Sequence, residues 1–179
     1  MLSLEELESH IRNIPDFPIK GVIFKDITTL LTHPGALNDA VEHLKRACEV
    51  FEYDAVAAIE SRGFIFGSVL AAKLDLPLVL IRKPGKLPGE TVSEEYSLEY
   101  GTNTVEMHRD SLPSGSRVLI VDDLIATGGS AMAAVNLLRR DGCTVAGAAF
   151  VVDLSFLGGS DRLSENGIAC ASLIEVKSE

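Results

Sequence analysis

The stretch Val118-Leu119-Ile120-Val121-Asp122-Asp123-Leu124-Ile125-Ala126-Thr127-Gly128-Gly129-Ser130 decides the fold. Its first four residues are apolar, which predicts a strand buried on both faces, as in a parallel sheet. Two carboxylates follow at once, and then a small glycine-bearing turn. Apolar residues then recur at helical spacing, at Ala131, Ala134, Val135 and Leu138. The predicted order is therefore a buried strand, an acidic tip, a turn and a helix.

This order indicates a ligand site. In open α/β sheets, ligands bind outside the carboxyl ends of the strands, and a helix N-terminus offers unpaired N–H groups that suit a phosphate. The Gly128-Gly129 pair permits close backbone approach, and Thr127 and Ser130 add hydroxyls. The carboxylates of the Asp122-Asp123 pair would repel a phosphate, so they are better placed to accept sugar hydroxyls or to hold a metal. Together these groups predict a sugar phosphate.

A less specific interpretation is that Asp-Asp before Gly-Gly serves only as turn and capping chemistry. We favour the ligand site because hydroxyls, glycines and carboxylates coincide at the place where a ligand is expected. Two familiar phosphate motifs are absent from the sequence, since it contains neither a P-loop nor a Gly-x-Gly-x-x-Gly after a strand.

Composition narrows the class of protein. The 179 residues fit one domain, residues 1–179, with an apolar fraction of 46%. The net charge of −10 argues against nucleic-acid or anionic-membrane binding, so a phosphorylated substrate must be held by local cations. Cys48, Cys143 and Cys170 are dispersed, as expected for reduced thiols in a cytoplasmic protein. We expect no membrane span, because no apolar run approaches about 20 residues. We expect no signal peptide, because the N-terminus is acidic and lacks an apolar segment.

The N-terminal part is unusual. Ser3 and Glu6 have the spacing of a capping box, which predicts a short helix ending near Asn13. The segment 14–34 is rich in proline and glycine yet apolar, and we expect it to be irregular. It either packs on the core or forms a hood over a flat ligand, in which Phe24 would stack on a base.

The rest of the chain alternates strands with helices, which predicts a mostly parallel sheet. Expected strands lie at 55–59, 77–81, 145–152 and 168–174, and expected helices begin after Pro34 and at Phe64. Glu60-Ser61-Arg62-Gly63 follows the first of these strands and suggests anion binding, with a surface ion pair as the alternative for Arg62. The cation-rich loop 82–89 predicts a lid that grips pyrophosphate, or else a solvated loop. Alternation over 93–107 predicts a β-hairpin.

Two resemblances extend this interpretation. The central stretch resembles the 5-phosphoribosyl-1-pyrophosphate (PRPP) motif of type I phosphoribosyltransferases. Nearly the whole chain resembles the adenine phosphoribosyltransferases. That second resemblance is carried by Pro15-Asp16-Phe17-Pro18, Gly21-Val22-Ile23-Phe24-Lys25-Asp26-Ile27, Glu60-Ser61-Arg62-Gly63-Phe64, Ile81-Arg82-Lys83-Pro84-Gly85-Lys86-Leu87-Pro88-Gly89 and Tyr96-Ser97-Leu98-Glu99-Tyr100-Gly101. The last two segments select adenine, because phosphoribosyltransferases for other bases do not share them.

The resemblance implies an α/β, type I phosphoribosyltransferase fold with a central mostly parallel sheet flanked by helices. It also implies an N-terminal hood over about 1–34 and a flexible β-hairpin lid over about 84–107. The implied reaction transfers the phosphoribosyl group from PRPP to adenine, giving AMP and pyrophosphate in purine salvage. The implied cofactor is Mg²⁺, held mainly through PRPP and pyrophosphate without a dedicated protein ligand. The implied assembly is a cytoplasmic homodimer.

The resemblance also assigns roles to residues. The residues that would bind the ribose hydroxyls and phosphate are Asp122, Asp123, Ala126, Thr127, Gly128, Gly129 and Ser130. The residues that would bind pyrophosphate are Ser61, Arg62, Arg82, Lys83 and Lys86. Those that would contact adenine are Ile23, Phe24 and Lys25. Glu99 matches the proposed general acid/base, with Tyr100 beside it in the lid. Lys25 stands where arginine is frequent, and Ser130 where threonine is frequent.

Two rival functions differ in chemistry. A salvage enzyme for another purine would need a group that reads a 6-oxo substituent, and no such candidate is evident. A PRPP-sensing regulator would usually carry a DNA-binding segment or a basic face, whereas this chain starts with a short acidic helix and is strongly negative overall.

Overall fold

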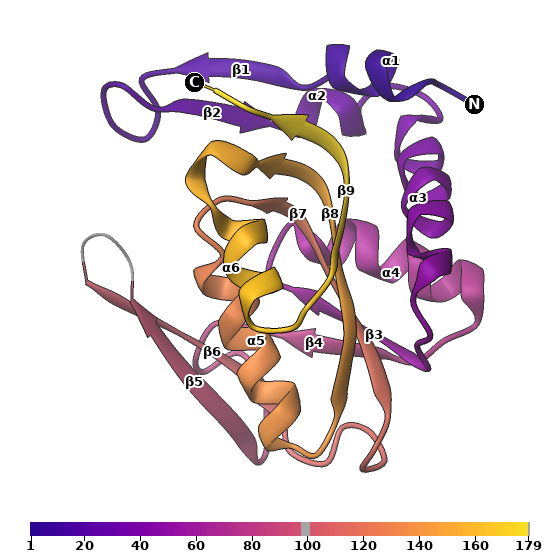
Figure 1. Ribbon diagram of the computed structural model, residues 1–179, viewed down its shortest axis with the longest axis vertical. Coiled ribbons are helices and arrows are strands. Elements are labelled where there is room, and N and C mark those ends of the chain that lie inside the picture. Colours follow the sequence, from indigo (N-terminus) through magenta and orange to yellow (C-terminus); the bar gives the residue numbers. More distant parts are fainter. Residues whose placement is uncertain (98–100, 179) are drawn as a thin grey trace.

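A parallel five-stranded sheet with strand order β4-β3-β7-β8-β9 forms the centre of the protein (Figure 1). The computed structural model describes residues 1–97 and 101–178. The strands are β3 (Ala55–Ile59), β4 (Leu78–Ile81), β7 (Arg117–Ile125), β8 (Thr144–Leu154) and β9 (Cys170–Val176). All neighbouring pairs in this sheet run parallel, so the prediction of a mostly parallel sheet is confirmed.

Helices cover both faces of this sheet. The helices of the larger layers are α3 (Ala36–Ala47), α4 (Gly63–Leu74), α5 (Gly129–Arg140) and α6 (Gly159–Glu165), and short 3₁₀ turns lie at Cys48–Val50 and Ser155–Leu157. Leu119 and Val121 belong to the core that contains α3 and α4, whereas Val118 and Ile120 belong to the core that contains α5 and α6. The apolar run is therefore buried on both faces, as its composition predicts.

The central strand does not end where the sequence suggests. We expected Asp122 and Asp123 at a tip beyond the strand, but β7 continues through both to Ile125. The reason is unequal neighbours: β3 pairs with β7 only as far as Val121, whereas β8 pairs with it as far as Ile125. Past Val121, one edge of β7 is thus free of a neighbouring strand in the sheet.

The N-terminal segment differs from the prediction. Helix α1 (Leu4–Ser9) begins with the expected capping box, in which the Glu6 N–H donates to Ser3 Oγ at 3.2 Å and the Ser3 N–H to Glu6 Oε2 at 2.7 Å. It ends before Asn13, because β1 (Arg12–Pro15) pairs antiparallel with β2 (Ile23–Asp26). The expectation of an irregular 14–34 segment was therefore wrong, and the short helix α2 (Thr28–Leu31) follows.

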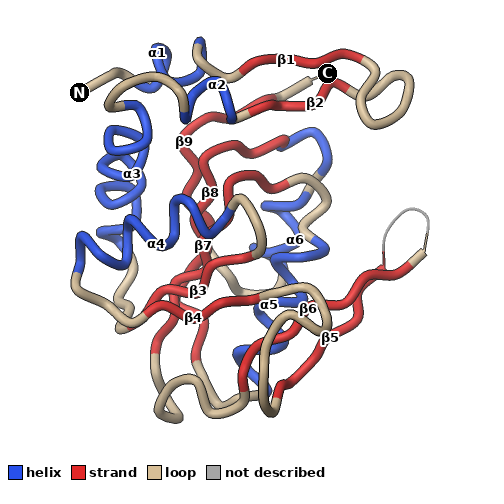
Figure 2. Tube along the Cα trace, turned by 180° about the vertical axis from the view of Figure 1, so that it is seen from behind, coloured by secondary structure: helices blue, strands red, loops and turns tan. Residues whose placement is uncertain are grey.

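A second antiparallel hairpin lies beside α5. It consists of β5 (Thr91–Ser97) and β6 (Thr102–His108), which confirms the predicted pairing. In Figure 2 the hairpin extends past α5 on the side of the molecule away from α3. Glu94 fixes it to α5, because its carboxylate accepts from the Asn136 amide at 2.9 Å and forms an ion pair with Arg140. Among the described residues, no helix combines the length and apolarity needed to cross a bilayer.

Candidate active site

A cavity of about 520 Å³ opens at the carboxyl ends of β3 and β7. These two strands are neighbours, and each leads through a short turn into a helix, α4 or α5. The cavity wall consists of Ile59, Glu60, Ser61, Arg62, Lys83, Tyr96, Val105, Asp122, Asp123, Leu124, Ile125, Ala126, Thr127, Gly128, Gly129, Ser130 and Ala131. All seven residues predicted for the ribose phosphate thus share one wall with Ser61, Arg62 and Lys83.

The phosphate loop, defined as residues 126–130, ends in the first turn of α5. Gly128 caps this helix with a φ of +76°, a left-handed conformation that favours glycine. No acidic residue lies in the first turn of α5, and the residues of that turn, 129–131, line the cavity. The loop therefore presents the positive end of a 12-residue helix, together with the Thr127 and Ser130 hydroxyls, to an anion.

The two carboxylates are buried, with 9% of Asp122 and 3% of Asp123 exposed. The Asp123 N–H donates to Asp122 Oδ1 at 2.8 Å, and Arg62 Nε lies 2.8 Å from Asp123 Oδ2 as an ion pair. Burial raises the pKa of Asp122 well above its ordinary value, and the neighbouring Asp123 charge adds to the effect. Burial also raises the pKa of Asp123, but Arg62 opposes the rise. Arg62 therefore offsets part of the cost of burying the Asp123 charge.

The predicted pyrophosphate residues separate into two groups. Ser61, Arg62 and Lys83 line the cavity, whereas Arg82 and Lys86 are not part of its wall. Arg82 instead pairs with Glu60 at 3.2 Å and donates to the Lys86 carbonyl at 3.2 Å. Glu60 also accepts the Lys83 N–H at 2.8 Å. In this structure Arg82 therefore ties the cation-rich loop to the end of β3.

Tyr96 is a wall residue that sequence reasoning did not assign to the site. It lies half-buried on β5 of the hairpin, and its ring carbon Cδ2 would be 3.0 Å from a Cβ added at Gly129. The alternating pattern of residues 93–100 indicated which face of the predicted strand carries Tyr96. Only the contact with Gly129 of α5 shows that its ring lies against the phosphate loop. Glu99 and Tyr100, expected beside it in the lid, lie outside the described residues.

A second cavity of about 250 Å³ adjoins the phosphate loop under the N-terminal hairpin. Its wall consists of Val22, Ile23, Lys25, Thr127, Leu154, Phe156, Leu157, Val176 and Ser178. Thr127 belongs to both cavities, so the two sites meet at that residue. Leu154, Phe156 and Leu157 were not predicted as site residues. Their signal in the sequence was weak, namely an apolar cluster directly before Gly158-Gly159.

The three residues predicted for a base do not share one face of β2. Ile23 and Lys25 line the second cavity, whereas Phe24 is not part of its wall. Instead, Phe24 makes an edge contact with Phe17 at 5.2 Å between ring centroids, and the Arg62 guanidinium lies 5.3 Å from the centre of its ring. Because side chains alternate along a strand, residues 23 and 25 point one way and residue 24 the other.

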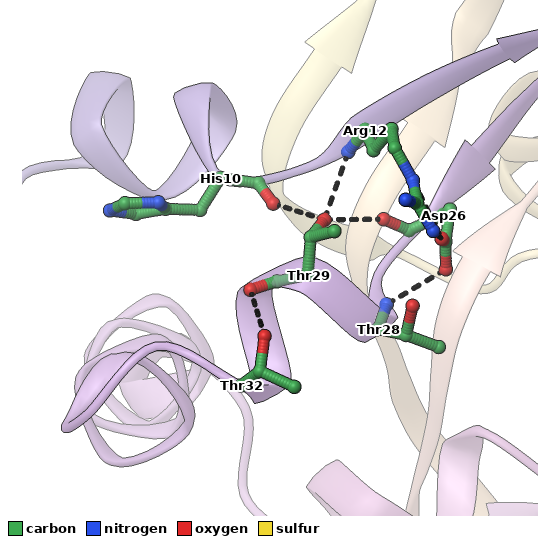
Figure 3. Close-up of polar contacts among 6 residues, drawn as sticks. All are labelled: His10, Arg12, Asp26, Thr28, Thr29 and Thr32. Carbon is green, nitrogen blue, oxygen red and sulfur yellow. Dashed lines mark hydrogen bonds and ion pairs between the residues drawn. The ribbon is translucent and has the colours of Figure 1, made fainter.

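A polar cluster holds the base of the N-terminal hairpin in place (Figure 3). Asp26 is 6% exposed and accepts from Arg12 Nη2 at 2.6 Å and from the Thr28 N–H at 2.9 Å. The Thr29 hydroxyl donates to the His10 carbonyl at 2.6 Å and accepts the Arg12 N–H at 3.2 Å. Hydrogen bonds from Thr28, and then from Arg12, lower the pKa of Asp26 to about 2. We call these five residues the hood clasp.

No group of three or more histidine, cysteine or acidic side chains in the described ranges could hold a metal ion. Asp123 Oδ2, the buried carboxylate oxygen in the wall of the large cavity, is already paired with Arg62 Nε at 2.8 Å. A magnesium ion would therefore enter this site on the oxygens of a phosphorylated substrate, and the acidic pair would hold it through its waters, because Mg²⁺ usually keeps several of them.

Comparison with known proteins agrees with this geometry. The family model for the phosphoribosyl transferase domain matches residues 27–165, so this chain is a phosphoribosyltransferase in its fold. An adenine phosphoribosyltransferase from Thermobifida fusca is 52% identical over 159 residues, covering 89% of this chain and 90% of its own length. One from Chloroflexus aurantiacus is 51% identical and covers 93% and 96%.

Solved structures give the same result. The crystal structure of adenine phosphoribosyltransferase from Thermoanaerobacter pseudethanolicus superposes with a TM-score of 0.92 at 48% identity, over 97% of this chain and 99% of that one. The enzyme from Saccharomyces cerevisiae, complexed with an imino-altritol bisphosphate and adenine, gives 0.87 at 37% identity, over 95% and 97%. This chain belongs to the adenine phosphoribosyltransferase family.

Proposed function

We infer that this chain transfers the 5-phosphoribosyl group of PRPP to adenine, giving AMP and pyrophosphate. The observation that carries the proposal is the large cavity, where an acidic pair, a helix-capping phosphate loop and Arg62 meet at the ends of two adjacent strands. The identity with adenine phosphoribosyltransferases over most of the chain supports the same reaction. The adenine-bound yeast relative supports the choice of base.

We assign the donor to the large cavity. Residues 126–130 surround the ribose phosphate, and Asp122 and Asp123 accept hydrogen bonds from the ribose hydroxyls. Ser61, Arg62 and Lys83 bind pyrophosphate, and Arg82 and Lys86 join them from the adjoining loop when the donor is bound. The ion pair between Arg62 and Asp123 supports this assignment, because it keeps a cation at the cavity before the donor arrives.

We assign adenine to the second cavity and its border with the first. Ile23, Lys25, Phe156 and Leu157 all line this cavity, and its mostly apolar wall suits a flat apolar ring. Phe24 lies on the opposite face of β2, beside Arg62, so it would reach the base only at the border with the large cavity. The position of Thr127 in both cavities supports this arrangement, because the acceptor nitrogen must reach the ribose carbon that pyrophosphate leaves.

The reaction breaks the bond between the ribose C1 and a pyrophosphate oxygen and forms one between C1 and an imidazole-ring nitrogen of adenine. Arg62 and the cationic loop stabilise negative charge on the leaving pyrophosphate. Glu99 accepts the proton that the adenine ring loses, and the hairpin closes over the sugar to exclude water. Bound magnesium would supply further charge stabilisation on the pyrophosphate oxygens.

We also propose that the chain is a cytoplasmic homodimer. Leu78 and Leu80 project from the edge strand β4 and are 36% and 37% exposed. Apolar side chains on an edge strand are commonly covered by another chain, which supports self-association. Light scattering that finds a stable monomer would contradict the dimer. The dispersed free cysteines support a reducing compartment.

A competition assay tests the proposed function. Equal concentrations of adenine, hypoxanthine and guanine are mixed with PRPP, magnesium and the protein, and the nucleotides formed are separated. We expect AMP to predominate. Predominant IMP or GMP would contradict the adenine assignment, and PRPP binding without any nucleotide formed would favour a regulator.

A further inference from the structure

The first turn of α6 lies directly against the back of the phosphate loop. Gly159 is buried, and a Cβ added there would lie 2.3 Å from the Ala126 carbonyl oxygen and 2.8 Å from the Gly128 nitrogen. From the other side, a Cβ added at Gly128 would lie 2.9 Å from the Gly159 carbonyl oxygen. The two backbones are therefore in contact, with no side chain between them.

A second contact joins the same two segments. Arg162 lies about one turn further along α6, and its Nη1 donates to the Thr127 carbonyl at 3.4 Å. Leu163 is fully buried and anchors the helix in the core shared with α5. The phosphate loop is thus held from behind by a backbone contact at Gly159 and by a hydrogen bond from Arg162.

The segment 154–162 also reaches the acceptor side. Its first part contributes Leu154, Phe156 and Leu157 to the second cavity, and its last part supports the loop of the first. Neither Gly159 nor Arg162 is a wall residue of either cavity. They therefore act on substrate indirectly, through the phosphate loop that they contact.

We propose that Gly159 and Arg162 are positioning residues that hold residues 126–128 in the conformation that receives the ribose phosphate, and so set the affinity for PRPP. This proposal rests on the proposed function. A displaced loop turns its N–H groups away from the phosphate, and misplacement of about 1 Å can lower catalytic efficiency by about 100-fold.

The test compares Gly159→Ala and Arg162→Met with two matched controls. Gly159 has no positive φ, so alanine is compatible with its backbone and only the contact is perturbed. Gly147→Ala changes another buried glycine without a positive φ, whose Cβ would lie 3.0 Å from the Phe51 ring and which lies in neither cavity wall. Arg139→Met removes an arginine whose Nη2 donates to the Asn166 carbonyl, at the end of α6, at 3.2 Å.

We measure kcat, the KM for PRPP and for adenine, and the affinities for ribose 5-phosphate and for pyrophosphate by calorimetry. For Gly159→Ala, we expect about a tenfold or larger rise in the KM for PRPP and a matching loss of ribose 5-phosphate affinity. Arg162→Met should raise the KM for PRPP by about threefold to tenfold, and Arg162→Lys should partly restore the wild-type value. Pyrophosphate affinity and both controls should stay within about twofold of the wild type.

Equal losses for ribose 5-phosphate and pyrophosphate, or equal losses in the controls, would overturn the proposal. If Gly159→Ala does not fold, the exposed Arg162 variants decide the outcome, because removing an exposed side chain leaves the core intact. If the wild type binds ribose 5-phosphate but forms no AMP, the proposed function fails, while the binding comparison still tests the role of the two residues.

Discussion

Replacing Asp26 with asparagine should loosen the N-terminal hairpin and weaken adenine binding before it affects PRPP. The carboxylate accepts hydrogen bonds from Thr28 on α2 and from Arg12 on β1, and it sits directly after Lys25 on β2. Asparagine keeps the size of the side chain and an oxygen for the Thr28 N–H. It removes the charge that pairs with Arg12 at 2.6 Å.

The size of the effect follows from the pKa of Asp26. The hydrogen bonds lower this pKa from 3.8 to about 2, and the side chain is 9% exposed. A displacement of that size is worth about 2 kcal/mol of unfolding free energy at neutral pH. Because asparagine retains one hydrogen bond, we expect a loss of about 1–2 kcal/mol. That loss would lower the Tm by about 2–8 °C for a domain of this length.

The pH dependence provides a second measure. The pKa of Asp26 is lower in the folded protein than in the unfolded chain, so its stabilisation is complete above about pH 4 and is lost as pH falls through about 2. The difference between the wild type and Asp26→Asn should therefore shrink on acidification, to roughly half by pH 3. Urea unfolding at pH 7 and pH 3 measures both differences.

Steady-state kinetics connect the clasp to the site. We expect the KM for adenine to rise about fivefold to tenfold in Asp26→Asn, with the KM for PRPP within about twofold. Asp54→Asn is the control, since Asp54 forms a comparable pair with Arg117 at 2.8 Å on the exposed surface far from the hairpin. A variant with wild-type stability and wild-type KM for adenine would refute the reasoning. So would a stability difference that stays constant between pH 7 and pH 3.

Three further predictions concern other parts of the molecule. Glu99→Gln should lower kcat by about 100-fold to 10,000-fold if Glu99 is the acid/base, and near-wild-type turnover would exclude that role. Gly67→Ala should destabilise the protein by about 1–3 kcal/mol in urea unfolding, because the new Cβ would lie 2.6 Å from the Ala58 Cβ between α4 and β3; an unchanged midpoint would show that the two elements separate easily. Tyr96→Ala should raise the KM for PRPP whereas Tyr96→Phe should not, because the ring and not the hydroxyl contacts Gly129; equal effects of both variants in the same assay would contradict this.

Local patterns in the sequence predicted most of the fold. The apolar runs at 55–59 and 118–121, the capping box at Ser3 and the helical spacing after Ser130 each correspond to an element of the structure. These signals depend on residues within a few positions of one another, which is why they can be detected without tertiary contacts. The N-terminal hairpin was missed because its strands are stabilised by each other and by the hood clasp, and neither is visible in a local window.

The site was predicted in composition but not in arrangement. The strand-end motifs placed Asp122, Asp123, the phosphate loop and Arg62 together, because parallel neighbouring strands deliver their carboxyl ends to one edge. The resemblance to a known family added adenine and the roles of Glu99 and Lys86. Neither source indicated that Tyr96 covers Gly129 or that Leu154, Phe156 and Leu157 form a second wall.

The sequence alone determined the class of fold, the phosphate loop and the acidic pair, since these depend on residue type and short spacing. Only the tertiary structure decided which groups meet across the chain. Strand β7 continues through Asp123 because β8 pairs with it further along than β3 does. On β2, Phe24 lies beside Arg62, whereas Ile23 and Lys25 line the second cavity. It also set Gly159 against Ala126. Such contacts join residues tens of positions apart, and their geometry is fixed by packing and not by local propensity.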